Sequence, residues 1–374
     1  MSECIVHAHP PTGSAPQPAH EPMFGLSTRF PHQFPQQCNR LLGVVDDMQR
    51  AGLGWTSGHW AAALIAAAQD ERTLIELTSA NRQSRWCWRA PGTLSGCFYE
   101  PWSRCMAPAA LDRMVTRQLS SFAVGAQLLS ARNQTLKTEA VQFLYGRPLA
   151  WVRDMGDCIM RRDGLASGGF VNVFVRDSEE KRREANSRRT KMGLPASHAP
   201  YVQLFEWLTN TSGAIEPSPA VAFLQTSSSS ALTQIVGQRS AVHWSYSNNT
   251  RSDHDDWGGW QAAAPDLTTA VAAVNLYIGS HASHFVGLHS SSWTGLQASL
   301  MRGKLALPLL GLCCGCKQGD QWNRVGVGGL VNINVMVYGP ASAEHIAAPR
   351  INGCTSAVWG DQRQRAMKSS LGAG

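Results

Sequence analysis

The sequence has no long apolar run, few charged residues and neither of two common hydrolase motifs. Its longest apolar segment, "LALPLLGLCCG" from Leu305, is shorter than the roughly 20 residues of a membrane-spanning helix, and it contains Pro308. Neither G-x-S-x-G nor H-E-x-x-H occurs, so nothing indicates the hydrolases that carry them. No signal peptide is recognisable in the polar, proline-rich N-terminus. We therefore expect no membrane insertion within this sequence.

The composition is that of a folded protein that prefers anionic ligands. The chain has 374 residues, a length that is enough for two domains of ordinary size. Of these residues 43% are hydrophobic and 16% are charged, as in folded proteins. Its net charge of +7 would suit a nucleic acid, a phosphorylated substrate or a membrane surface. The main basic run, "KRREANSRRTK" from Lys181, has interleaved acids and no stacking aromatics. That pattern favours a solvated helix face, and we expect no nucleic-acid partner.

Ten cysteines are present, and several cluster with aromatic residues. The segment "RWCWRAPGTLSGCFYEPWSRC" holds Cys87, Cys97 and Cys105, a loop-rich arrangement that predicts local disulfides in an oxidising compartment. Free buried thiols are the alternative. The later "CCGC" run also fits disulfides or buried thiols better than zinc, because no convergent set of ligands is apparent. We expect neither a metal nor another cofactor.

The first half of the chain has the pattern of a βαβ unit. Residues 1–35 are expected to form a flexible tail. A strand is predicted over residues 41–47, and a helix that starts near His59 is expected to be capped by Thr56 or Ser57. "TLIEL", residues 73–77, predicts the next strand.

Strands and helices alternate again in the second half. The predicted strands are "FVNVFVR", "AVAFLQT", "AVHW" and "HFVGL", and the predicted helices are "APYVQLFEWLTN", "ALTQIVGQ", "DLTTAVAAVNLYIGSHA" and "WTGLQASLM". Two such alternations predict two α/β domains with mainly parallel sheets, whose ligands bind beyond the carboxyl ends of the strands.

Polar groups follow several of these strands. Arg176 ends the first of them, where a guanidinium can grip a phosphate by two parallel hydrogen bonds. A salt bridge to the charged segment that follows is the other interpretation. Serines at positions 227–230 and 290–292 each lie between a strand and a helix. They are either helix caps or parts of one nucleotide site.

The segment "GLGWTSG" resembles a dinucleotide-binding fingerprint but does not match it. Gly52 and Gly54 fit, whereas the third glycine, Gly58, comes one position late. Glu76 has the position of the ribose-binding acid in such folds. We consider nicotinamide binding a minor alternative. A loop in which Gly52 and Gly54 let a ligand approach the backbone is the favoured interpretation.

In order and spacing, three stretches resemble the α1,6-fucosyltransferase family, which includes core-glycan and nodulation enzymes and is related to the protein O-fucosyltransferases. "AGLGWTSGHWAAALIAAAQDERTLIEL" is similar to the family's glycine-rich loop, helix and strand. "VFVRDSEEKRREA" resembles its "VHVRRxDKxxxEA" motif. "AVAFLQTSSSS…HFVGLHSSSWTGLQASLM" resembles "VFVATDDP…FVGTFSS…LAYELM". Together they span most of residues 35–305.

The resemblance implies a GT-B glycosyltransferase with two Rossmann-like domains that transfers fucose from GDP-fucose to a glycan, with inversion and without metal. By motif position, Arg176 would hold the donor β-phosphate and Glu184 would deprotonate or orient the acceptor hydroxyl. The other implied donor contacts come from one guanine-reading position and two serine pairs: Asn275, Ser290, Ser291, Ser227 and Ser228.

This sequence departs from the family pattern at six positions, two of which are Ser227 and Ser228, where the family usually has acids. The family's histidine, second arginine, lysine and guanine-reading aspartate are replaced by Phe174, Asp177, Glu180 and Asn275. These changes leave two alternatives open: a transferase for another nucleotide sugar, and a non-catalytic relative that binds glycan or nucleotide.

The resemblance also implies a domain layout and a compartment. An acceptor-side domain is expected over residues 36–165, a nucleotide-sugar domain over 166–335 and an extension over 336–374. The expected partners are a nucleotide sugar and a glycan or glycoprotein acceptor, and the expected location is the secretory pathway, in the Golgi lumen. An anchor for that location is not recognisable in this sequence.

Overall fold

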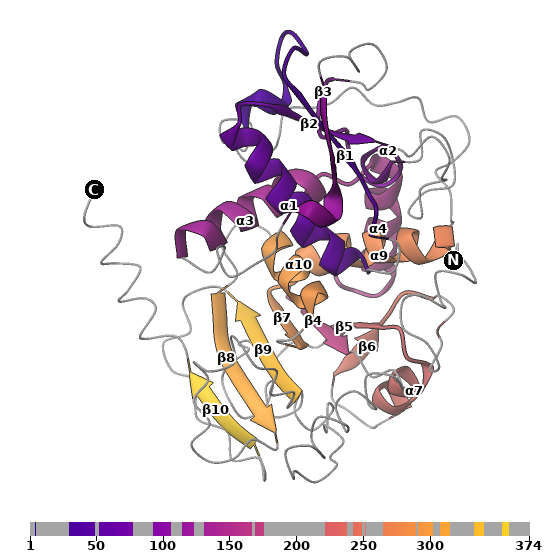
Figure 1. Ribbon diagram of the computed structural model, residues 1–374. Coiled ribbons are helices and arrows are strands. Elements are labelled where there is room, and N and C mark those ends of the chain that lie inside the picture. Colours follow the sequence, from indigo (N-terminus) through magenta and orange to yellow (C-terminus); the bar gives the residue numbers. More distant parts are fainter. Residues whose placement is uncertain are drawn as a thin grey trace. The chain divides into compact units, whose positions relative to one another are not determined.

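The structure is a computed structural model (Figure 1). It describes residues 4, 30–48, 52–77, 93–105, 114–122, 131–166, 169–175, 221–237, 242–248, 251, 265–288, 291–301, 307–314, 333–339 and 354–358. They form two compact units. Unit 1 comprises Met1–Ile159, Trp257–Ser280 and Gly295–Leu300, and unit 2 comprises Met160–Asp256, His281–Thr294 and Met301–Gly374.

Unit 1 contains a parallel sheet of three strands in the order β2-β1-β3. Its strands are β1 (Leu41–Val45), β2 (Thr73–Leu77) and β3 (Met114–Gln118). Both neighbours of β1 run parallel to it. The βαβ unit formed by β1, the helix after it and β2 is confirmed, whereas β3 was not predicted, because its sequence "MVTRQ" is mostly exposed and polar.

Unit 1 also contains helices and 3₁₀ turns. They are α1 (Leu53–Gln69), α2 (Leu94–Cys97), α3 (Ala131–Tyr145), most of α4 (Ala150–Arg162), α9 (Pro265–Ser280) and the 3₁₀ turns η2 (Pro31–Gln33) and η4 (Leu119–Ser121). Helix α1 packs against α3, and its alanines at 61, 63 and 67 are fully buried. Small side chains at these positions let the neighbouring elements approach closely.

The start of α1 differs from the prediction. The helix begins at Leu53 with Gly52 as its N-cap, so the expected loop up to Ser57 is its first turn. Thr56 Oγ1 donates to the carbonyl of Gly52 (3.1 Å), and Ser57 Oγ donates to the carbonyl of Gly54 (2.8 Å). Both hydroxyls therefore donate to preceding carbonyl groups and do not cap a helix that begins near His59. Ser and Thr side chains can form either kind of hydrogen bond near a helix start.

Helix α9 belongs to unit 1 although it is far in sequence from most of that unit, whereas the sequence predicts continuous domains that meet at residue 165. The hydroxyl of Tyr277 on α9 donates to Asp157 on α4 (2.9 Å). An ideal Cβ at Gly156 would lie 2.4 Å from the Tyr277 ring, so only glycine allows this approach. Residues far apart in sequence thus pack in one unit.

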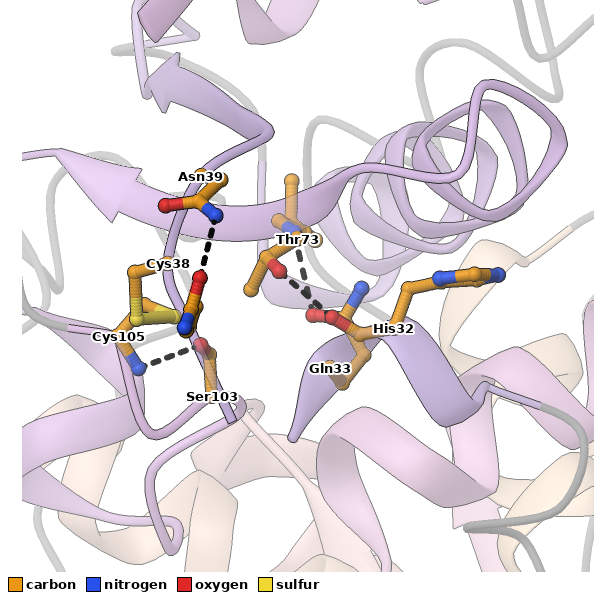
Figure 2. The surroundings of a disulfide bond; sticks show 9 residues. His32, Gln33, Cys38, Asn39, Thr73, Ser103 and Cys105 are labelled. Carbon is orange, nitrogen blue, oxygen red and sulfur yellow. Dashed lines mark hydrogen bonds between the residues drawn. A yellow bond between two sulfur atoms is a disulfide. The ribbon is translucent and has the colours of Figure 1, made fainter. Parts of the chain in front are cut away.

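Two disulfides in unit 1 confirm the prediction of oxidised cysteines. Cys38 is bonded to Cys105, and Cys4 is bonded to Cys158. Figure 2 shows the first, which lies beside a cluster that includes Leu41 and Ile75 of the sheet. Cys97 is also disulfide-bonded. Cys105 therefore pairs with Cys38, which the aromatic-rich segment does not contain, because the fold and not the local spacing brings the two sulfurs together.

Part of the segment 1–35 also belongs to unit 1. Cys4 carries its disulfide, and the Phe30 side chain is fully buried, with its ring 5.3 Å from that of Phe143. The carbonyl of His32 accepts a hydrogen bond from Thr73 Oγ1 (2.6 Å) on β2, visible in Figure 2. The flexible tail predicted for these residues does not describe Cys4 or residues 30–35.

Unit 2 contains a seven-stranded sheet in the order β10-β8-β9-β7-β4-β5-β6. Its strands are β4 (Val171–Val175), β5 (Val221–Thr226), β6 (His243–Ser245), β7 (His284–Leu288), β8 (Leu307–Cys314), β9 (Ile333–Gly339) and β10 (Cys354–Val358). Strands β7, β4, β5 and β6 are parallel. Their apolar sequences fit strands covered on both faces. The predicted α/β class with mainly parallel sheets is confirmed.

Three antiparallel strands extend this sheet beyond β7. Strand β9 pairs with β7 and β8, and β10 pairs with the outer edge of β8 (Figure 1). The sequence did not predict them, since periodicity cannot separate a short apolar run from a buried helix and their pairing is non-local. Strand β10 lies inside the segment 336–374, which the sequence assigns to an extension.

Two helices complete the described part of unit 2. Helix α7 (Ser229–Gly237) follows β5, and α10 (Ser292–Leu300) begins in unit 2 after β7. Both were predicted. The end of α4 is also described: Gly164 takes a positive φ of 72°, and the N–H of Leu165 returns to the Met160 carbonyl (2.8 Å). A glycine just past a helix end allows this closure without strain.

Candidate functional site

Three adjacent strands of unit 2 end at the same edge of the sheet. β4 ends at Val175, β5 at Thr226 and β7 at Leu288, and β4 lies between the other two. Because these strands are parallel, their carboxyl ends form one edge, where ligands of open α/β sheets bind. The serines after β5 and those after β7 therefore lie on either side of the end of β4.

The turn after β5 is built by Ser228. Its Oγ accepts a hydrogen bond from the N–H of Ala231 (3.0 Å), which is the bond expected of a helix cap. Its own N–H donates to Thr226 Oγ1 (3.1 Å), and the residue is fully buried. Ser227 is partly exposed. Ser228 thus shapes the turn, whereas Ser227 is the serine of this pair that can reach a ligand.

The turn after β7 is different. Ser291 is the N-cap residue of α10, but its side chain makes no capping hydrogen bond, so Ser291 does not support the helix-cap interpretation of this turn. An ideal Cβ at Gly287 would lie 2.7 Å from Thr294 Oγ1, so the first turn of α10 sits directly on β7. A helix N-terminus without a side-chain cap presents N–H groups and a partial positive charge, which suits an anion.

Arg251 supplies a positive charge at the same edge, and the sequence pattern did not single it out. Its Nε donates to the carbonyl of Thr226 (3.1 Å), the last residue of β5, and its Nη2 donates to the carbonyl of Ser247 (2.8 Å). Burial lowers the pKa of Arg251 to about 10, partly offset by Tyr246, so the guanidinium remains charged at neutral pH. It lies in a polar loop without motif or periodicity.

A pair of aromatic side chains also lies at this edge. The rings of Phe174 on β4 and Trp293 on α10 have centroids 6.0 Å apart and planes inclined by 35°. The indole N–H of Trp293 donates to Gln225 Oε1 (2.9 Å), and Gln225 Nε2 donates to Asn172 Oδ1 (2.9 Å). In the sequence, Phe174 stands out only as a departure from the family motif. The glutamine inside the otherwise apolar strand "AVAFLQT" was the one feature of the sequence that could have indicated these hydrogen bonds, because a buried amide needs polar partners.

The remaining predicted residues divide into two groups. Arg176, Glu184 and Ser290 lie outside the described residues, and their roles stay predictions. Asn275 lies on α9 and so belongs to unit 1, whereas the serine turns belong to unit 2. Gly52 and Gly54 also belong to unit 1, where they form the cap and first turn of α1; ligand approach to them stays a prediction.

The carboxyl edge of the unit 1 sheet carries acids. Both oxygens of Glu76 accept backbone N–H bonds at the start of α2, from Leu94 (2.7 Å) and Ser95 (3.0 Å). Desolvation raises the pKa of Glu76 to about 7, although these hydrogen bonds oppose the shift. This carboxylate holds protein backbone, which argues against the ribose-binding role of the nicotinamide hypothesis.

Asp47, just after β1, is engaged in a similar way. It accepts hydrogen bonds from the N–H (2.9 Å) and hydroxyl of Ser120. Desolvation acts to raise its pKa, but the bonds from Ser120 prevail and the pKa is lowered. Asp47 therefore stays ionised and links the ends of β1 and β3.

The described residues contain neither a cluster of metal ligands nor a membrane-spanning helix. No group of three or more His, Cys, Asp or Glu in this part of the chain could hold a metal ion, and the expectation of a metal-free protein stays a prediction. None of the described helices is long and apolar enough to span a bilayer.

Comparison with known proteins gives structural neighbours only. No protein family and no curated protein sequence matches the chain. Among solved structures, it is similar to NodZ α-1,6-fucosyltransferase co-crystallised with GDP, at 15% identity and a TM-score of 0.38, covering 69% of this chain and 91% of that one. It is also similar to fucosyltransferase NodZ from Bradyrhizobium, at 14% identity and a TM-score of 0.38, covering 69% and 92%.

Proposed function

We propose that this protein is a GT-B glycosyltransferase that transfers fucose from GDP-fucose to a glycan hydroxyl, with inversion and without metal. The observation that carries the proposal is the edge of the unit 2 sheet, where serine turns flank the end of β4. The motif resemblance assigns donor binding to these same turns. One of them ends in a helix N-terminus that has no side-chain cap from Ser291.

The chemistry required is charge stabilisation of a departing nucleoside diphosphate. The acceptor hydroxyl attacks the anomeric carbon, the bond to the β-phosphate oxygen breaks, and GDP leaves with the electron pair. In the proposal Arg176 and the N-terminus of α10 stabilise the developing negative charge, since no metal is invoked. Glu184 accepts the proton of the hydroxyl, and Asn275 reads guanine through its amide.

The compartment follows from redox chemistry. Disulfides persist in the secretory pathway and are rare in the cytosol. Those between Cys38 and Cys105 and between Cys4 and Cys158 support a secreted or luminal location, which we propose to be the Golgi lumen, where glycan acceptors are found.

A second candidate is supported by one contact. Phe174 stands where the resembling family has a histidine, and its ring packs against Trp293. Together with Asp177 and Asn275, this change favours either another donor sugar or a non-catalytic binding protein.

Calorimetry with GDP, UDP and GDP-fucose tests the proposal. We expect GDP to bind in the micromolar range and UDP much more weakly, because guanine has base-edge groups that uracil lacks. A fucosyl-transfer assay with mixed glycan acceptors then separates the candidates: GDP binding without transfer selects the non-catalytic one. Equal affinity for UDP and GDP would leave only the fold.

A further inference from the structure

The pair formed by Phe174 and Trp293 is here called the aromatic platform. Its two rings are partly exposed to solvent, which core packing alone would not require. Both lie among buried residues at the ends of β4 and β7. One ring comes from the penultimate residue of β4 and the other from the first turn of α10. The platform thus faces the same sheet edge as the serine turns.

Hydrogen bonds to buried amide side chains fix the orientation of the Trp293 side chain. Its indole N–H is held by Gln225, which is in turn bonded to Asn172 on the neighbouring strand. Asn172 and Gln225 are 0% and 2% exposed, and burying two amides in a sheet costs free energy that their mutual hydrogen bond only offsets. Such a buried connection is typical of sites whose first layer of side chains must be held in one geometry.

The position of the platform selects which part of a donor it meets. Trp293 lies in the first turn of α10, next to the helix N-terminus that the proposed function assigns to the departing diphosphate. If that N-terminus holds the β-phosphate, the ring attached to that phosphate is the glycosyl ring. Guanine is separated from it by the α-phosphate and the ribose.

We infer that the aromatic platform stacks against the apolar face of the donor's glycosyl ring and favours a 6-deoxyhexose, whose C6 methyl group replaces the hydroxymethyl group of a hexose. This inference rests on the proposed function. Phe174 offers only apolar surface, and the single polar atom of the Trp293 side chain is turned to Gln225. A methyl group and ring C–H bonds can lie on such a surface without losing hydrogen bonds, whereas an extra hydroxyl would lose one.

The test compares GDP with GDP-fucose, since the two differ only by the sugar. In Trp293→Ala we expect the affinity for GDP-fucose to fall about 3- to 10-fold relative to GDP, the range for a lost ring contact. Affinity for GDP itself should stay within about twofold. Trp293→Phe, which keeps a ring but loses the bond to Gln225, should show a smaller change, and Phe174→Leu should also reduce the preference. Val236→Ala, at a side chain that is 38% exposed on α7 in the same unit, is the control and should change neither affinity.

Each other outcome has a defined meaning. Equal weakening of GDP and GDP-fucose in Trp293→Ala would overturn the inference, because the ring would then serve the nucleotide or the fold. An unchanged preference in all three platform variants would also overturn it and would leave the proposed function intact. If Trp293→Ala does not fold, Trp293→Phe and Phe174→Leu decide. Absence of any GDP binding by the wild type would reject both the proposed function and the inference.

Discussion

Both sheets contain parallel βαβ units, yet the carboxyl edges of their parallel strands differ in chemistry. The edge of unit 1 carries the carboxylates Asp47 and Glu76, both hydrogen-bonded to nearby protein N–H groups. The edge of unit 2 carries serine turns, a helix N-terminus and the charged Arg251. A phosphorylated ligand would be repelled by the first edge and attracted by the second. The fold alone therefore does not define a site; the residues after each strand do.

Arginines show the same contrast. Arg147 of unit 1 is 8% exposed and forms an ion pair with Glu100 (3.3 Å), which is 6% exposed on its side chain and also lies 3.6 Å from Arg153. Its guanidinium lies 5.2 Å from the Phe143 ring centroid. This arginine belongs to the core, whereas Arg176 is proposed to bind a ligand.

The largest effect on stability is expected from Arg147→Ala. Removing the cation leaves Glu100 buried beside only the more distant, partly exposed Arg153, which should lower the free energy of unfolding by about 3–5 kcal/mol. Arg40→Ala is the matched control, because its ion pair with Glu71 has side chains that are 57% and 64% exposed, and it should cost about 0–1 kcal/mol. Denaturant unfolding measures both. Similar midpoints for the two variants would contradict a structural role for the buried pair.

Arg176→Ala should act on catalysis and leave folding unchanged. We expect a loss of about 2–4 kcal/mol in transition-state stabilisation, seen as a fall in kcat/KM of roughly 30- to 1000-fold, and weaker GDP binding. Arg176→Lys keeps the charge but loses the planar fork, so it should fall between wild type and alanine. The melting temperature is the control. Intact GDP binding, or a melting temperature lowered as far as that of Arg147→Ala, would make Arg176 a structural ion-pair residue.

The smallest effect concerns Glu76 and its dependence on pH. Its pKa is raised from 4.5 to about 7 in the folded protein, so between these values the folded state binds more protons than the unfolded state. Stability therefore falls as pH rises from about 4.5 to about 7, by roughly 1–2 kcal/mol once solvent screening at this partly exposed side chain is considered. Glu76→Gln should lose this dependence. A wild-type unfolding curve that gains stability over the same range, relative to the variant, would show that the two N–H bonds outweigh desolvation.

Local pattern predicted much of the parallel architecture. The apolar strands β1, β2, β4, β5, β6 and β7 and the helices α7, α9 and α10 follow from strand and helix periodicity. Cys105 shows the limit of such patterns: its oxidised state was expected from composition, but its partner Cys38 was not. Strand β3 and the antiparallel strands were not predicted. Their sequences have the same local pattern as loops or buried helices, and only pairing with a neighbouring strand defines them as strands.

By itself, the sequence determined the α/β class, the serines at the strand ends and the position of Arg176 in its motif, because these depend on residues close together along the chain. Tertiary structure decided that Thr56 and Ser57 lie inside α1 and that Glu76 caps α2. It also decided that Trp293 is joined to Asn172 through Gln225. Each of these depends on a hydrogen bond whose partner is chosen by packing, since a hydroxyl, a carboxylate or an indole can satisfy its bonding in several ways, and only the folded chain determines which partner lies within reach.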